Sequence, residues 1–237
     1  MRQSVSCHFA GFEGLRTIEL GCGEGKVSLL FALRGARTTL VDYSDQQLRH
    51  ARYVAQELEV KPVFHSGNLL HLSSEFIGRY DVSMSFGTAE HFFGDDRQAI
   101  FDVHARVLRP GGITFVWVPN RWALLFHIGV KVRQKLGRGT CHVDEIPFTR
   151  KELVQRAARA GLTDVRIVGA DYLRNDFKNF IVDIRRLRRG ADADDMFQSA
   201  ERARAKLLST MENNERRLGL LANRFSYPLL LIGRRPV

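Results

Sequence analysis

Three glycines spaced two residues apart, Gly21, Gly23 and Gly25, follow an apolar stretch that contains one acid, Glu19. Glycines let a backbone turn sharply and let a ligand approach it closely. Apolar residues then recur at near-helical spacing over residues 27–33, which predicts a strand, a glycine turn and a helix. The N–H groups at the start of such a helix lie beside the turn. The spacing therefore predicts a nucleotide or nucleoside site at the carboxyl end of a first strand.

The acid before the turn indicates which ligand this site accepts. A dinucleotide site has the pattern G-x-G-x-x-G, but here the third glycine comes one residue early and Lys26 takes its place. The carboxylate of Glu19 would repel a pyrophosphate. S-adenosylmethionine carries no phosphate, and its α-ammonium and sulfonium groups both suit a nearby carboxylate. The turn therefore favours S-adenosylmethionine over a dinucleotide.

The run E-L-G-C-G-E-G at 19–25 resembles motif I of the class I S-adenosylmethionine-dependent methyltransferases. V-L-R-P-G-G at 107–112 is also typical of them, and S-F-G-T-A-E-H-F at 85–92 resembles the branch that methylates small molecules and quinols. The resemblance is clearest over 15–120 and weaker over 143–169. It implies S-adenosyl-L-methionine as cofactor and a Rossmann-like, doubly wound α/β fold. Its seven-stranded sheet would be mostly parallel with an antiparallel last strand, plus helical insertions.

Further cofactor contacts are expected at the ends of the next two strands. Residues 37–41 predict a second strand that ends at Asp42, about 20 residues beyond the turn, where an acid accepts ribose hydroxyls. Residues 62–65 predict a third strand. Asn68 then stands where the family usually has an adenine-binding Asp; it can still accept through its side-chain oxygen, and a plain turn residue is the alternative. The expected cofactor-binding residues are Glu19, Gly21, Cys22, Gly23, Gly25, Asp42, Tyr43, Asn68, Leu69, Phe86 and Gly87.

The remaining elements alternate between strand and helix. Further strands are predicted at 80–86, 113–118, 165–168 and 225–233, and further helices after Ser44, after Asp95 or Asp96, and after Thr149. The segment 108–112 is expected to end a helix and to precede the fifth strand. The loop at 87–92 follows the central strand, so it faces the crevice where a doubly wound sheet binds ligands.

Methyl transfer from a sulfonium needs a base only when the nucleophile must lose a proton. His91 is the best candidate for that base, because it lies in the loop after the central strand and its ordinary pKa is about 6.5. The alternative is a histidine that only packs or hydrogen-bonds. Glu90 and His91 resemble a Glu/His metal cluster of some quinol methyltransferases. Gly87 replaces a further acid of that cluster, so no metal is expected.

Length and composition are those of one domain over residues 1–237, with insertions at about 121–142 and 170–223 that would form a lid or select the substrate. Three cysteines without metal-ligand spacing indicate a reducing compartment. No apolar run is long enough to span a membrane, and the first residues lack the apolar core of a signal peptide. These features predict a cytoplasmic protein.

The basic charge lies in the second half of the chain: residues 1–120 carry a net charge of −1 and residues 121–237 carry +11. A solvated face is the simplest interpretation. A lid at 121–139 that touches an anionic membrane is another, and RNA binding is favoured less because no recognition module is visible. The lid residues would be Trp122, Leu124, Leu125, Phe126, Lys131, Arg133, Lys135 and Arg138.

Taken with the family resemblance, these features predict a methyltransferase that acts on oxygen or nitrogen of a small or lipid-like molecule. Two alternatives stay open at this point. One is an RNA methyltransferase that uses the basic half, and the other is a catalytically silent methyltransferase fold that serves as a binding partner.

Overall fold

The structure, a computed structural model, describes residues 9, 11–123, 127–128, 131, 144–169 and 226–237. The chain divides into two units: Met1–Val118 with Lys151–Ile167 and Leu230–Val237, and Pro119–Arg150 with Val168–Leu229. The ranges of the second unit enclose both expected insertions, and the single domain stays a prediction. None of the helices in the described part of the chain has the length and apolar character needed to cross a membrane.

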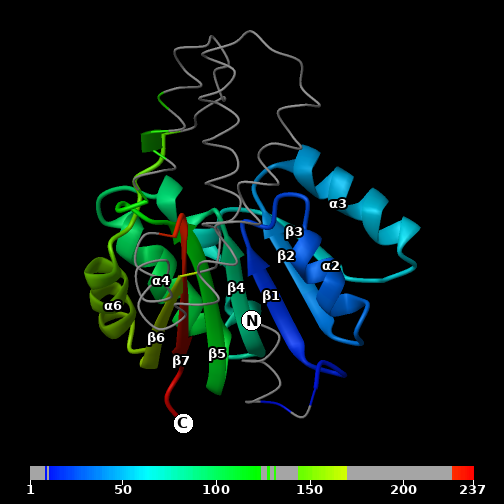
Figure 1. Cartoon of the computed structure of the whole chain (residues 1–237). Helices are drawn as coiled ribbons and strands as arrows, with labels where there is room; N and C mark the ends of the chain where they lie inside the picture. The colour runs from blue at the N-terminus through cyan, green and yellow to red at the C-terminus, as the bar shows by residue number, and fades with distance from the viewer. Residues whose placement is uncertain (1–8, 10, 124–126, 129–130, 132–143, 170–225) are drawn as a thin grey trace, which may run out of the picture. The chain divides into compact units, whose positions relative to one another are not determined.

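A seven-stranded sheet is the centre of the fold, with the strand order β3-β2-β1-β4-β5-β7-β6 (Figure 1). The strands are β1 (Arg16–Leu20), β2 (Arg37–Asp42), β3 (Val63–Ser66), β4 (Tyr80–Phe86), β5 (Leu108–Pro119), β6 (Thr163–Gly169) and β7 (Pro228–Arg234). Strands β1 to β5 pair in parallel. Backbone bonds join Gly111 to Arg235 and Asn120 to Tyr227, so β7 runs antiparallel to β5. The predicted fold class is confirmed.

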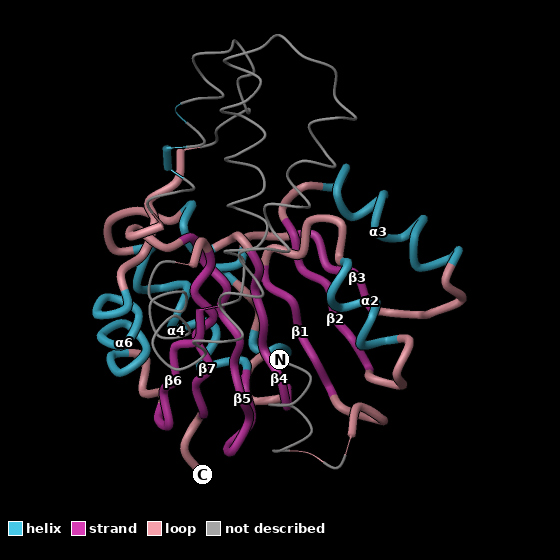
Figure 2. Tube along the Cα trace, viewed as in Figure 1, coloured by secondary structure: helices cyan, strands magenta, loops and turns pink. Residues whose placement is uncertain are grey.

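Helices flank this sheet, as the cyan and magenta segments of Figure 2 show. They are α2 (Lys26–Ala32), α3 (Asp45–Glu57), α4 (Asp96–Val107) and α6 (Arg150–Arg159), with short 3-10 turns η1 (Leu69–His71), η2 (Ser74–Phe76) and η3 (Ala89–His91). Ser44 caps α3 by accepting from the Gln47 N–H, as its sequence predicts. Asp95 precedes α4 as expected, but its side chain makes no capping bond.

The strand order reverses between β1 and β4, because the chain builds outward from β1 to β3 and then returns to the other side. Right-handed crossovers place helices before and after such a reversal on opposite faces of the sheet. Accordingly α2 packs on β1 and β2, α3 on β2 and β3, and α4 on β4. The central strands are covered on both faces, which explains why Ile18, Leu40, Met84 and Phe115 are completely buried.

The largest difference from a predicted boundary is at β5, which begins at Leu108, whereas the sequence places residues 108–112 outside the strand. Tyr80 pairs with Leu108 and Val82 with Ile113, so the register of β4 and β5 shifts across this segment. Gly111 has a φ of 77°, which a residue with a side chain rarely adopts. The R-P-G-G segment is therefore an irregularity inside the strand. Its turn-forming residues give no indication that β5 pairs with β4 both before and after it.

A buried polar cluster lies between α4 and the centre of the sheet, around His104, which is fully buried. The Ser83 hydroxyl donates its hydrogen to the His104 carbonyl. The Ser83 oxygen is therefore left to accept from the Nδ1–H of the His104 ring at 3.1 Å. Thr114 Oγ1 also lies 3.1 Å from Nδ1, and Ser85 Oγ lies 2.9 Å from Nε2. This pattern assigns a neutral ring that donates from Nδ1 and accepts at Nε2. Burial lowers the pKa of His104 to about 3.

We expect His104 to stay neutral where exposed histidines take up a proton. Its pKa of about 3 in the folded chain lies below the ordinary 6.5, so the unfolded chain binds the extra proton between these values. The free energy of unfolding should therefore decrease as the pH is lowered below 6.5. This group contributes up to about 1.4 kcal/mol per pH unit. NMR would show the His104 ring signals constant from pH 7.5 to 5, the range in which a histidine with an ordinary pKa takes up its proton. Protonation of His104 above pH 5.5 would contradict the assignment.

Candidate cofactor site

The expected cofactor residues gather at the carboxyl edge of the sheet, where four neighbouring strands end. Leu20 of β1 pairs with Val41 of β2, and Asp42 pairs with Ser66 of β3. On the other side, Glu19 of β1 pairs with Met84 of β4. The turns that follow these four strands are therefore side by side at the point where the strand order reverses. That is where open α/β sheets bind their ligands.

The three glycines of the first turn all have positive φ, but different neighbours require them. A Cβ on Gly21 would lie 2.4 Å from Cγ2 of Thr88, and one on Gly25 would lie 2.2 Å from Cδ2 of Leu40. These two glycines allow close packing inside the protein. Gly23 has a φ of 50°, and no atom of the described chain lies within 4 Å of where its Cβ would be. Gly23 thus leaves the middle of the turn open for close approach by a ligand.

Asp42 holds the turn through its carboxylate, which is nearly buried. One oxygen accepts from the Gly23 N–H at 2.8 Å, and the other accepts from the Ser44 N–H at 2.9 Å. A carboxylate has about four acceptor positions, so each oxygen can take another hydrogen bond. Asp42 therefore fixes the backbone of the glycine turn and keeps capacity for the hydroxyl groups of a ligand.

Glu19 lies deeper than Asp42 and is 3% exposed. It accepts from the Ser28 N–H in the first turn of α2 at 3.2 Å. Burial raises the pKa of Glu19 to about 7; hydrogen bonding from Ser28 offsets part of this effect, and the charge of Asp42 adds a little to it. A bound cation would favour the ionised form again. The ionisation of Glu19 is thus sensitive to a positive charge near the turn.

The remaining expected cofactor residues occupy varied surroundings. The Cys22 side chain is buried, and burial raises the pKa of its thiol, which makes it an inert packing group. Tyr43 is 82% exposed beside Asp42, so its ring is accessible to a ligand. Asn68 caps η1 by accepting from the Leu70 N–H at 2.9 Å, and Leu69 is buried. Asn68 therefore serves its turn, as the simpler interpretation predicts, and its amide group still has further bonding capacity.

The loop after β4 is joined to the glycine turn. Thr88 Oγ1 donates to the Gly21 carbonyl at 3.1 Å, and η3 follows directly. His91 is half-buried in η3, and its backbone N–H donates to the Thr88 carbonyl. Phe86, at the end of β4, packs against the core cluster around Met84. Thr88 was not singled out in the sequence, where a threonine in a loop carries no distinct signal.

The sequence also predicts that no metal is bound and that residues 121–139 form a lid. Among the described residues, no three His, Cys, Asp or Glu side chains are close enough together to hold a metal ion, and the absence of a metal stays a prediction. Trp122 is 60% exposed, and Lys131 is exposed too. The other lid residues, Leu124, Leu125, Phe126, Arg133, Lys135 and Arg138, lie outside the described residues.

Comparison with known proteins agrees with this geometry. A family model described as a methyltransferase domain matches residues 18–112. A ubiquinone biosynthesis O-methyltransferase of Aromatoleum aromaticum is 32% identical over 168 residues, which cover 69% of this chain and 70% of the relative. This chain belongs to the class I S-adenosylmethionine-dependent methyltransferases. Its cofactor is S-adenosyl-L-methionine, and the open turn at Gly23 and the free acceptor capacity of Asp42 fit that molecule.

Solved structures share the fold of this methyltransferase at low identity. The magnesium protoporphyrin IX methyltransferase of Synechocystis PCC 6803 with bound SAH has a TM-score of 0.58 and 16% identity, over 98% of this chain and 79% of that one. The cyclase SpnF has a TM-score of 0.62 and 19% identity, over 100% and 80%. A cyclase among the neighbours means that the fold alone does not define the reaction.

The contact between Gly21 and Thr88 can be tested by adding a methyl group. We expect Gly21→Ala to lower the free energy of unfolding by about 1–3 kcal/mol more than Gly14→Ala, because the new Cβ overlaps Thr88. Gly14 is a matched control, since its φ of 70° is similar and nothing in the described chain lies within 4 Å of its Cβ position. Chemical denaturation of the double variant Gly21→Ala/Thr88→Ala should recover most of the difference. Equal losses at Gly14 and Gly21 would contradict a steric role for Thr88.

Proposed function

We propose that this methyltransferase methylates a hydroxyl oxygen on the ring of a small or lipid-like molecule, with His91 as the base. The observation that carries the proposal is the similarity to a ubiquinone biosynthesis O-methyltransferase over more than two thirds of both chains. A half-buried histidine in the loop that follows the central strand supports it. Relatives of this kind favour oxygen as the acceptor over nitrogen.

The cofactor would be held by the residues at the edge of the sheet. Bound S-adenosylmethionine supplies a methyl group already activated by its sulfonium. The carboxylate of Asp42 would accept from the ribose hydroxyls, and the backbone at Gly23 would let the ligand come close to the turn. Tyr43 would pack on the adenine, and the Leu69 N–H would meet a ring nitrogen. The carboxylate of Glu19 would attract the positively charged groups of S-adenosylmethionine across the glycine turn.

A base is required by the chemistry of a ring hydroxyl. Such a group has a pKa near 10, as in tyrosine, so it is protonated at neutral pH and a weak nucleophile. An imidazole is partly neutral at that pH and can accept the proton. His91 would take it as the oxygen–methyl bond forms and the carbon–sulfur bond breaks. The buried elements around η3 would keep water from the reacting atoms.

The basic second half of the chain would help to bind the substrate. A lid at 121–139 would cover the acceptor and touch an anionic lipid surface, which suits a substrate with a long apolar tail. The exposed indole of Trp122 and the exposed Lys131 are compatible with such contact. Each basic side chain near an anionic surface contributes about 1 kcal/mol, so attachment would weaken with salt.

The acceptor class is tested by methyl transfer from labelled S-adenosylmethionine to four substrates. These are a catechol with an alkyl tail, the same ring without hydroxyls, an arylamine with the same tail, and a structured RNA. We expect a methyl ether of the catechol alone, identified by mass spectrometry. Label on the amine or on RNA would overturn the proposal. Binding of cofactor without any labelled product from these substrates or a cell extract would favour a silent fold.

Asp42 can be tested by cofactor binding alone. We expect Asp42→Ala to weaken binding of S-adenosylhomocysteine by about 1.5–3 kcal/mol, the range for a hydrogen bond to a charged group, because it loses acceptors for the ribose. Loss of the Gly23 contact adds to this effect. Titration calorimetry measures it, with Asp45→Ala as a control that removes an exposed carboxylate from the first turn of α3. Unchanged affinity in the Asp42 variant would mean that the sugar is held elsewhere.

His91 can be tested by the pH dependence of the reaction. We expect His91→Gln to lower kcat by about 10²–10⁴, the usual contribution of a general base, with unchanged affinity for S-adenosylhomocysteine. The residual rate should rise with pH as the acceptor hydroxyl ionises without help. His50→Gln, on the exposed side of α3, is the control. A histidine with only a packing role would instead lower thermal stability and leave the shape of the pH profile unchanged.

A further inference from the structure

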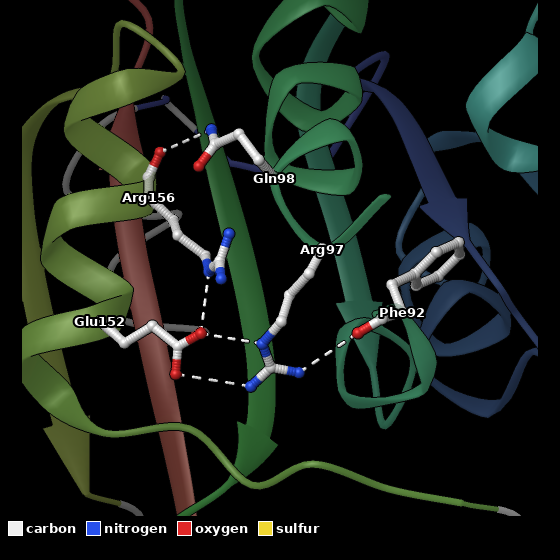
Figure 3. A network of polar contacts seen from close by, with 5 residues as sticks. All are labelled: Phe92, Arg97, Gln98, Glu152 and Arg156. Carbon is white, nitrogen blue, oxygen red and sulfur yellow. Dashed lines mark hydrogen bonds and ion pairs between the residues drawn. The ribbon is translucent and has the colours of Figure 1, made fainter. Parts of the chain in front are cut away.

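A buried arginine joins α4 and α6 to the loop that carries His91 (Figure 3). Arg97, in the first turn of α4, is 4% exposed. Its Nε donates to Glu152 Oε1 of α6 at 2.8 Å, and its Nη2 lies 3.5 Å from the other carboxylate oxygen. Its Nη1 donates to the carbonyl of Phe92, the residue that ends η3, at 3.4 Å. One guanidinium therefore contacts both α6 and the loop that carries His91.

The position of Arg97 is costly for a residue that would serve packing alone. Removing a charge from water costs several kcal/mol, and a well-packed apolar side chain often serves a helix interface as well or better. The amino end of a helix also disfavours a cation. Arg156 donates to the same Glu152 at 2.9 Å, so the carboxylate has a second cation. An arginine at 97 is therefore best explained by the planar fork, which can hold two acceptors at once.

The loop is fastened at its two ends by different parts of the protein. Thr88 attaches its start to the carbonyl of Gly21 in the glycine turn. Arg97 attaches its end at Phe92. His91 lies between these contacts, so its distance from the glycine turn depends on both. A side chain displaced by about 1 Å from its reacting partner can cost about 100-fold in rate.

We propose that Arg97 is a positioning residue that fixes η3, and with it His91, relative to the glycine turn. Glu152 holds the guanidinium in the orientation that reaches the Phe92 carbonyl. Burial raises the pKa of Glu152, but the hydrogen bonds and charges of Arg97 and Arg156 outweigh it and keep that pKa below its usual range. The carboxylate therefore stays ionised and the clamp persists at neutral pH.

The clamp also connects the loop to the start of α6. Helix α6 begins at Arg150, and Glu152 lies in its first turn. A displacement of α6 along its axis would move Glu152 and thereby Arg97 and Phe92. The position of the base is thus sensitive to the start of α6 through two side chains and one carbonyl.

The test compares Arg97→Lys with Arg156→Gln. A lysine keeps the charge and can pair with Glu152, but its single ammonium lacks the fork that also reaches Phe92. Arg156→Gln weakens the same carboxylate cluster without touching the loop. A separate link between α4 and α6, from Gln98 Nε2 to the Arg156 carbonyl at 3.2 Å, remains in both variants. Both should fold, which thermal melting verifies.

Two readouts separate positioning from stability. Hydrogen exchange of the His91 and Phe92 amides, both bonded within η3, should quicken about ten-fold or more in Arg97→Lys and stay unchanged in Arg156→Gln. With the catechol acceptor, kcat should fall about 10- to 100-fold in Arg97→Lys, whereas KM for S-adenosylmethionine should stay within about two-fold of the wild-type value.

The kinetic readout rests on the proposed function, but the exchange readout needs no acceptor, so the two ideas can fail separately. Unchanged exchange of the two amides in Arg97→Lys would overturn the positioning role. So would equal changes in exchange or kcat in Arg156→Gln, since that result would mark general loosening of the α4–α6 interface. If the wild-type protein methylates no catechol but the exchange difference holds, the clamp stands and the proposed acceptor is wrong.

Discussion

The close contact of Thr88 with the backbone of Gly21 is the constraint on which the site depends. It brings the turn after β1 and the loop after β4 within hydrogen-bond distance, where the strand order reverses between β1 and β4. A side chain at position 21 would separate them, because its Cβ would overlap the threonine. The turn expected to hold the cofactor and the loop that carries the candidate base are therefore joined by this contact. The rest of the edge can vary while this distance is kept.

Backbone N–H groups, more than side chains, organise the polar residues of the site. Glu19 accepts from Ser28 in α2, Asp42 accepts from Gly23 and Ser44, and Asn68 accepts from Leu70. Each acceptor thus fixes the turn in which a ligand would lie before any ligand arrives. A turn held in this way loses little conformational freedom on binding, so more of the interaction free energy is available for affinity. Glu19 and Asp42 thus have a structural role in addition to the binding role expected of them.

Local pattern explains which parts of this structure the sequence predicts. The bounds of β4, Tyr80–Phe86, and the cap of α3 at Ser44 depend on neighbouring residues and match their predictions. The early start of β5 depends on pairing across a bulge, which turn-forming residues conceal. Arg97 and Glu152 are 55 residues apart, and His104 meets Ser85 across 19. No periodicity or motif in the sequence indicates either contact, because only the packing of α4 against the sheet and α6 brings the partners together.

The same difference explains why the cofactor of this chain is easier to recognise than its acceptor. The residues expected to bind the cofactor lie in turns that are each a few residues long, so contiguous motifs in the sequence indicate them. An acceptor is expected to meet side chains from separate elements, with no fixed spacing between them in the sequence. A protein with this fold can thus keep its cofactor site while its reaction changes. The geometry of the loop after β4 likewise depends on tertiary contacts, such as the bond from Arg97 to the Phe92 carbonyl, which no contiguous motif records.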